Sequence, residues 1–165
     1  MFDYISWFAG LPPELATMLI AALPLAELRG ALPVALSVYH LSWWSAYFWS
    51  VLGNILPVIF ILWLLEPVSK YLIQHSKLAA KFFDLLFART KNKFADKYKK
   101  YGELALVIFV AIPLPMTGAW TGAIAAFLFG IPYKKSLSSI TLGVLIAGLI
   151  VTALYQGVFW GVKVF

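Results

Sequence analysis

Two charged side chains, Glu27 and Arg29, stand alone in an apolar region that covers residues 15–39. A charge at the centre of a bilayer costs about 2.5–3.5 kcal/mol on insertion scales, so it is rarely kept without a partner or a use. One interpretation is a structural ion pair that locks this stretch of chain. The other is a binding site in which Arg29 holds an anionic headgroup and Glu27 exchanges a proton. We favour the site, because ionisable residues within a membrane are functional candidates by default.

A second apolar region, residues 104–133, offers backbone groups in place of charges. Pro113 and Pro115 leave carbonyl groups without helical donors, and Thr117 adds a hydroxyl group. A half-helix that begins near Thr117 would point amide groups and a positive dipole end inward. We therefore count Thr117 with Glu27 and Arg29 as a substrate-binding or proton-binding candidate.

Three other positions have a structural alternative beside the functional one. Gly118 and Gly122 have the spacing of a small-residue helix contact, and packing is the commoner role of that motif. Asn54, between Gly53 and Pro57, could bind substrate, hydrogen-bond another helix or satisfy the backbone at a proline kink. The structural role is favoured for Asn54, which stays among the candidates.

The first apolar region is interrupted in its middle by Pro24, Gly30 and Pro33. As helices, residues 15–26 would rise only about 18 Å and residues 30–39 about 15 Å, whereas a bilayer core is about 30 Å thick. Each piece therefore reaches about half-way. Paired broken segments are typical of transporter sites, so we predict a re-entrant hairpin in each broken region. The alternative is a kinked spanning helix at each place.

The remaining apolar regions, residues 41–65 and 136–162, carry no charge before Lys163 and are long enough to span a bilayer. Across the whole chain 62% of residues are hydrophobic and 12% are charged, against about 25% charged in soluble domains. The chain is therefore predicted to be an all-α integral membrane protein with lipid as its solvent, and to form a single membrane domain, residues 1–165.

Between the two halves lies a basic segment, residues 67–103, with nine of the thirteen lysines and arginines. Its polar residues recur at helical spacing, which predicts an amphipathic helix on the inner membrane surface. We expect residues 67–100 to meet anionic lipid on the cytoplasmic side. Nucleic acid is not an expected partner, because the positive charge lies beside long apolar runs.

The two broken regions resemble each other. A shift of 89 places Pro24 on Pro113, and a shift of 90 places Gly53 on Gly143. Each repeat, residues 11–66 and 104–162, would be a hairpin followed by a spanning helix. Because each repeat then crosses the membrane once, the repeats are inverted, and the positive-inside rule places both termini outside the cell membrane.

Several classes of chemistry are not expected. The chain has no cysteine, and its two histidines lie far apart in sequence, so no metal-ligand spacing is present. No nucleophile motif, Walker loop or paired-carboxylate arrangement occurs. We predict neither an enzyme nor a cofactor.

Two stretches, PLAELRGALP at 24–33 and PLPMTGAWTGAIAAFLFG at 113–130, carry a resemblance to a known family. The chain resembles the small multidrug export proteins, distant relatives of the DedA/VTT superfamily. The resemblance implies two re-entrant hairpins in inverted repeats, and DedA relatives are associated with lipid movement and proton-dependent drug resistance. Their acidic residue in the first hairpin would match Glu27. DedA proteins carry arginines in the second hairpin, whereas this chain has none there. Arg29 in the first hairpin would have to supply the positive charge in their place.

We therefore predict a small transporter for an amphipathic substrate, either a lipid phosphate or a lipophilic drug, with a midplane site between two hairpin tips. The alternatives are a non-transporting membrane scaffold or assembly factor, and an energy-independent lipid scramblase. Two spanning helices enclose little volume, so a homodimer that buries Gly118 and Gly122 is expected.

Overall fold

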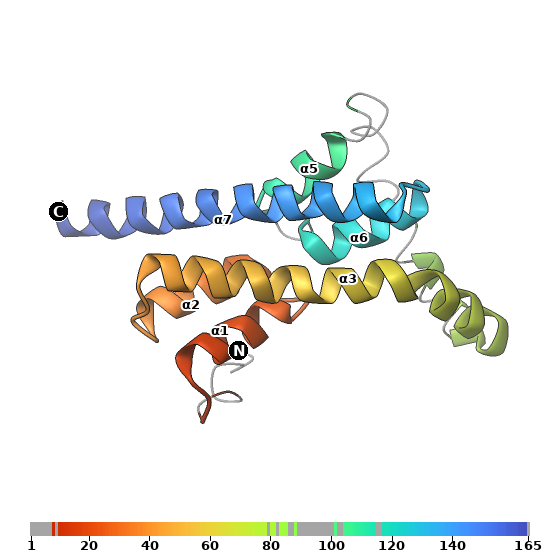
Figure 1. The fold of residues 1–165 in the computed structure, drawn as a ribbon, viewed down its shortest axis with the longest axis horizontal. Helices are drawn as coiled ribbons and strands as arrows, with labels where there is room; N and C mark the ends of the chain where they lie inside the picture. Colours follow the sequence, from red (N-terminus) through yellow and green to blue (C-terminus); the bar gives the residue numbers. More distant parts are fainter. Residues whose placement is uncertain are drawn as a thin grey trace. The chain divides into compact units, whose positions relative to one another are not determined.

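The computed structural model of the chain describes residues 8, 10–78, 80–81, 83–85, 88, 101, 104–114 and 117–164. Its described elements are all helical (Figure 1): α1 (Pro13–Ala22), α2 (Glu27–Ser37), α3 (Trp43–His75), α5 (Leu104–Ala111), α6 (Ala119–Leu128) and α7 (Tyr133–Val164). The prediction of an all-α protein is confirmed over these residues.

The chain forms two compact units, and α3 and α7 each contribute to both. Unit 1 consists of Met1–Leu56 with Val144–Phe165, and unit 2 consists of Pro57–Gly143. Unit 1 thus combines α1 and α2 with the first part of α3 and the last part of α7. Unit 2 combines α5 and α6 with the rest of α3 and the first part of α7.

Two helices are long and apolar enough to cross a membrane, at Trp43–Leu65 in α3 and Tyr133–Gly157 in α7. Only 28% and 39% of their most apolar windows are buried. Large side chains such as Phe60, Trp63 and Leu149 are exposed. Core helices of a soluble protein would bury such side chains. Exposed apolar faces of this kind suit contact with lipid, and the structure has two candidate membrane-spanning helices, as the sequence predicts.

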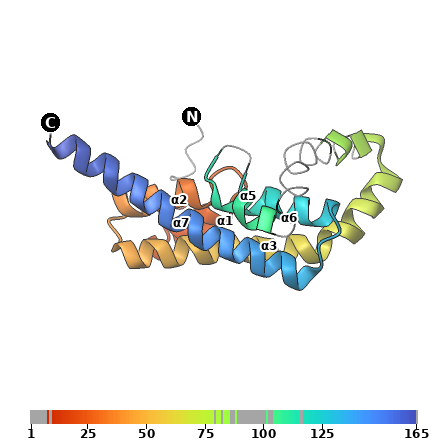
Figure 2. The same cartoon turned by 90° about the horizontal axis from the view of Figure 1, so that it is seen from above.

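Helix α3 continues beyond the predicted start of the basic segment at residue 67. It passes through Pro57 and Pro67 and ends at His75, and Figure 2 shows that its direction changes towards this end. A proline inside a helix removes one backbone hydrogen bond and bends the axis, which need not end the helix. About half of the predicted surface segment, including residues 89–100, lies outside the described residues.

The first broken region forms two short helices because prolines punctuate it. Helix α1 begins at Pro13, where a missing N–H is harmless, and Glu14 complements the positive end of the helix dipole. Leu23 precedes Pro24 and is driven to extended backbone, with ψ 136°, so α1 ends at Ala22.

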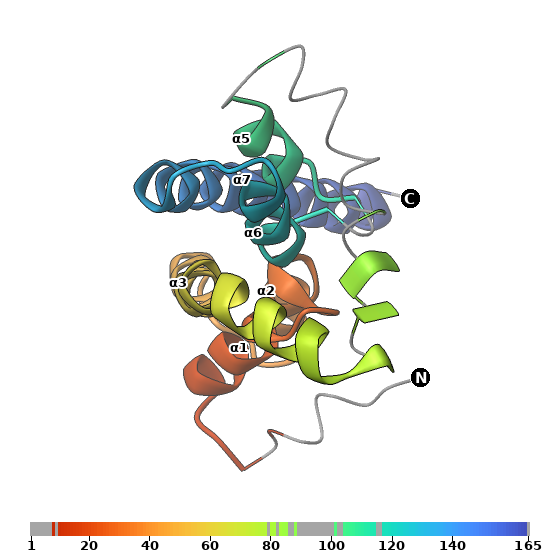
Figure 3. The same ribbon diagram turned by 90° about the vertical axis from the view of Figure 1, so that its right-hand side faces the viewer.

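Helices α1 and α2 pack against each other, as Figures 1 and 3 show. Their shared core consists of small and branched apolar side chains: Ile20, Ala21, Ala26, Ala31 and Val34. Burial of this core holds the two pieces together, since neither helix has a strong amphipathic pattern of its own. The region is a helical hairpin.

The second broken region forms a comparable pair, α5 and α6, which also contact each other. Helix α5 ends at Ala111, two residues before Pro113. Gly118 precedes α6 with φ 129°, a backbone conformation that a side chain would strain. Both broken regions are therefore divided at the places where proline and glycine occur in the sequence.

The two hairpins are joined to their long helices in the same way. Helix α3 begins at Trp43 and α7 at Tyr133, and the preceding turns place His40 and Gly130 at φ 52° and 63°. A Cβ atom at Gly53 would overlap the carbonyl oxygen of Met18 in α1, and one at Gly143 would lie 3.0 Å from the carbonyl oxygen of Val107 in α5. These pairs are 89 or 90 residues apart, the shifts that relate the two halves of the sequence.

Candidate functional site

Glu27 lies at the tip of the first hairpin, as the first residue of α2. Its side chain is buried, with 5% exposure. Its φ of 47° is in the left-handed region, which costs an L-residue about 1–2 kcal/mol. The helix dipole of α2 stabilises a negative charge at this position. A buried carboxylate on strained backbone is typical of a functional position. The packing of the surrounding hairpin holds Glu27 in this conformation.

Arg29 is half-buried in the first turn of α2, and Gly30 and Pro33 follow it in the same helix. Pro33 has no N–H to donate to the carbonyl group of Arg29, four residues earlier. The hairpin thus places a carboxyl group and a guanidinium group in the first turn of one helix. Pro24 is exposed on the connection before them.

Thr117 organises the tip of the second hairpin through its hydroxyl group. The oxygen lies 2.7 Å from the carbonyl oxygen of Ile112 and 2.8 Å from that of Leu114, and has one proton to donate to them. It also accepts the Leu114 N–H at 3.1 Å. The hydroxyl group is engaged by its own connection, so its role in substrate binding stays a prediction.

The other predicted residues of the second hairpin have different positions. Pro115 lies outside the described residues. Gly122 is buried, and a Cβ there would lie 2.6 Å from a methyl group of Val110 in α5. Gly122 therefore serves close packing within the chain, which was the alternative reading of its motif. Gly118 provides the backbone turn before α6, and Pro113 follows the end of α5.

Asn54 is buried in α3 with 3% exposure, and its side-chain oxygen has no hydrogen-bond partner. Ser50, one turn earlier, is fully buried and its hydroxyl oxygen also lacks a partner. Sequence reasoning identified Asn54 and missed Ser50. A signal for Ser50 was present in the sequence: it lies four residues before Asn54, so two polar side chains share one face of an apolar helix.

The predicted residues divide between the units. Glu27, Arg29 and Asn54 belong to unit 1, and Thr117, Gly118 and Gly122 belong to unit 2. The structure thus places each group on its own hairpin or helix. A midplane site formed by both tips stays a prediction.

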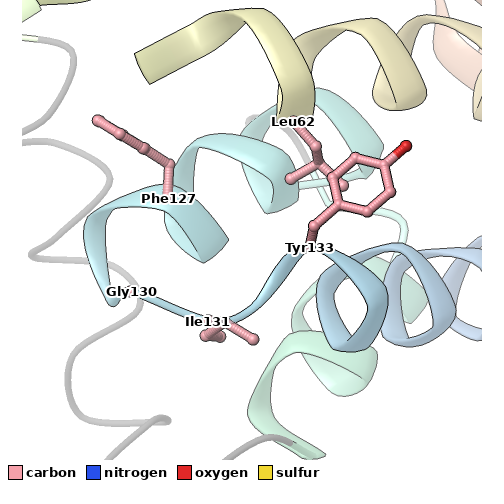
Figure 4. Close-up of a pocket in the computed structure, with 5 residues that line it drawn as sticks. All are labelled: Leu62, Phe127, Gly130, Ile131 and Tyr133. Carbon is pink, nitrogen blue, oxygen red and sulfur yellow. The ribbon is translucent and has the colours of Figure 1, made fainter. Parts of the chain in front are cut away.

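Unit 2 contains a cavity of about 410 Å³ where α6 turns into α7. Figure 4 shows its lining residues around that turn, with Leu62 reaching it from α3: Leu62, Phe127, Gly130, Ile131 and Tyr133. A second cavity in unit 2, of about 300 Å³, is lined by Leu104, Val107, Ser138, Ser139 and Leu142. Among the described residues that line the two cavities, none is a predicted site residue. Apolar side chains around a turn leave such hollows without any polar signal in the sequence.

A family model described as "Putative small multi-drug export protein" matches residues 27–150, which is most of the chain. The chain belongs to this family. Neither the curated proteins nor the solved structures include a significant match.

Membership of the small multi-drug export family agrees with the two membrane-spanning helices. It indicates a membrane transporter and not an enzyme. The matched segment begins at Glu27, the first residue of α2, and includes the second hairpin, the residues that line the cavity of about 410 Å³ and most of both candidate spans.

Proposed function

We propose that this protein exports amphipathic compounds across the cytoplasmic membrane, with Glu27 and Arg29 as the charged part of its site. The observation that carries the proposal is Glu27: a carboxylate with 5% exposure, on left-handed backbone, at the tip of a broken helix in a member of an export family. Burial and strain are both costly, and helix packing alone requires neither.

The chemistry of the two side chains suits a substrate with a charged head. Arg29 offers planar donors that match a phosphate or carboxylate group. Glu27 is placed to exchange a proton, because release of a proton would leave a carboxylate favoured by the dipole of α2. Proton-coupled export of a lipid phosphate or of a lipophilic drug follows as the finer proposal.

The cavity of about 410 Å³ supports an amphipathic substrate. Ligand sites are commonly concave and mostly apolar, with volumes of about 300–1,000 Å³. Phe127, Ile131 and Tyr133 would contact the apolar part of such a compound. We propose that the cavity receives this part of the compound.

The equivalent hairpin contacts support the inverted repeat and the re-entrant hairpins. In each half, the glycine of the long helix meets a carbonyl group of the first half-helix. The same helix contact thus occurs in both halves. Many transporters consist of two such halves that begin on opposite faces of the membrane. A midplane site between the two tips and a homodimer complete the proposal.

The test is transport in reconstituted vesicles by Glu27→Gln and Arg29→Ala. We expect each variant to lose at least about ten-fold in export of a fluorescent lipophilic drug or a labelled lipid phosphate, since about 1.4 kcal/mol of lost interaction corresponds to ten-fold. Glu14→Gln makes the same chemical change in the same hairpin and should transport normally.

Different results would favour the other functions. Flux in both directions that ignores a pH gradient would indicate an energy-independent scramblase. Loss of function on neutralising the lysines of 67–100, with no flux in the wild type, would indicate a scaffold or assembly factor. Folded Glu27→Gln and Arg29→Ala proteins with undiminished transport would remove both residues from the mechanism.

A further inference from the structure

Helix α3 carries two buried oxygen atoms that no group within the described residues satisfies. Ser50 and Asn54 are 0% and 3% exposed, and Ser50 Oγ and Asn54 Oδ1 have no hydrogen-bond partner. They are one turn apart, so they share one face of the helix. An unsatisfied buried polar group costs about 1–3 kcal/mol, and native proteins rarely keep two together.

The equivalent positions of α7 show that packing does not require polar side chains there. The shift of 90 that relates Gly53 to Gly143 relates Ser50 to Ile140 and Asn54 to Val144. Ile140 and Val144 are buried, at 0% and 1% exposure. At these equivalent positions α7 is therefore apolar, whereas α3 is polar.

The backbone next to Asn54 in α3 offers a third oxygen atom. Pro57 has no N–H, so the carbonyl group of Gly53 lacks its ordinary donor four residues later. Gly53 and Pro57 flank Asn54, and Gly53 packs against the backbone of Met18. A proline-freed carbonyl inside a membrane needs another partner, which an inserted water or ion can supply.

These three oxygen atoms suit one class of ligand. Neutral side-chain and carbonyl oxygens are hard donors, and hard cations prefer them. A divalent cation would call for carboxylates, whereas a hydroxyl, an amide and a carbonyl oxygen match a monovalent ion. Carbonyls freed by a break in a membrane helix coordinate sodium in other transporters. We infer that Ser50 Oγ, Asn54 Oδ1 and the Gly53 carbonyl oxygen form a binding site for a monovalent alkali cation, with sodium as the best fit.

Sodium binding can be measured on the full-length chain without any transport. Purified protein in detergent is heated in sodium chloride and, at equal ionic strength, in N-methylglucamine chloride. Binding to the folded state should lower the apparent unfolding equilibrium constant, by about 100-fold at a sodium concentration 100 times Kd. Radioactive sodium should bind the same sample saturably.

The first variant uses the residue that α7 already accepts at the equivalent position, and the second removes a hydroxyl group. Asn54→Val should fold, because Val144 fills the equivalent position, and should lose the sodium-dependent shift and the bound sodium. Ser50→Ala should weaken sodium binding at least ten-fold. Thr152→Val is the matched control: Thr152 is buried in unit 1, but its hydroxyl group already donates to Gly148 O at 2.8 Å. Sodium binding should survive this change.

A wild type that unfolds identically in both salts and binds no radioactive sodium would overturn the inference. An Asn54→Val or Ser50→Ala protein with the wild-type sodium response would do the same. The site is separate from the proposed export function. Export without sodium binding would refute the site alone, and sodium binding that persists in an inactive Glu27→Gln protein would support it.

Discussion

The contact between Gly53 and Met18 gives the sharpest prediction about stability. In the Gly53→Ala variant, the new methyl group would lie 2.8 Å from the carbonyl carbon of Met18 and closer still to its oxygen, whereas ordinary contacts begin at 3.4 Å. The obstructing atoms are backbone, so no side-chain rotation can relieve the overlap. Helices α1 and α3 must separate, on the order of 1 Å, and lose packing along their contact.

The free energy of unfolding should fall by about 2 kcal/mol. Overpacking costs about 1–3 kcal/mol, and the backbone contact puts this case at the upper end. The better helix propensity of alanine returns up to about 1 kcal/mol. A net loss of about 2 kcal/mol shifts the unfolding equilibrium about 30-fold.

The measurement is thermal or denaturant unfolding of purified protein in a mild detergent. Gly157→Ala is the matched control, because Gly157 lies in α7 and a Cβ there meets nothing within 4 Å. This control should be stabilised by up to about 1 kcal/mol. Equal stability of Gly53→Ala and wild type, with the expected behaviour of Gly157→Ala, would refute the close approach of α1 to α3.

Two other predictions concern the hairpins. Thr117→Val should destabilise the protein by about 0.5–1.5 kcal/mol, because the hydrogen bond that the hydroxyl group donates to the carbonyl oxygen of Ile112 or Leu114 is lost. Thr117→Ser should keep most of the stability, and equal unfolding of the two variants would show that the hydroxyl group does not hold the connection. In the inverted topology, Trp43→Cys should react with an impermeant thiol reagent only from outside and Tyr133→Cys only from inside. These residues begin α3 and α7 and are 38% and 42% exposed, and labelling of both from one side would contradict the inverted repeat.

Much of the fold could be predicted because local rules decide it. Proline and glycine divide the two short regions, and α1, α2, α5 and α6 end or begin near them. Length and apolarity identified the two spanning helices within a few residues. The junction at residue 67 was different: Pro67 suggested a boundary, whereas α3 continues to His75, because one lost hydrogen bond does not outweigh the rest of a long helix.

The candidate site was predictable only in part. Charge in an apolar region identified Glu27 and Arg29, but the left-handed backbone of Glu27 has no signal in the sequence. Gly122 was ambiguous until Val110 was found against it. Ser50 was missed, since serine is common in helices and its importance depends on burial and on the absence of a partner.

By itself, the sequence determined which helices are apolar and long enough to span a membrane, where the helices break and which residues recur at a spacing of 89 or 90, because hydropathy, proline chemistry and spacing are properties of the chain. The tertiary structure decided what each special residue does. It directs the Thr117 hydroxyl group to its own backbone, Gly122 to a neighbouring helix, and Ser50 and Asn54 to a buried face without partners. These outcomes depend on which atoms meet across helices, and contacts between distant segments arise only when the chain packs.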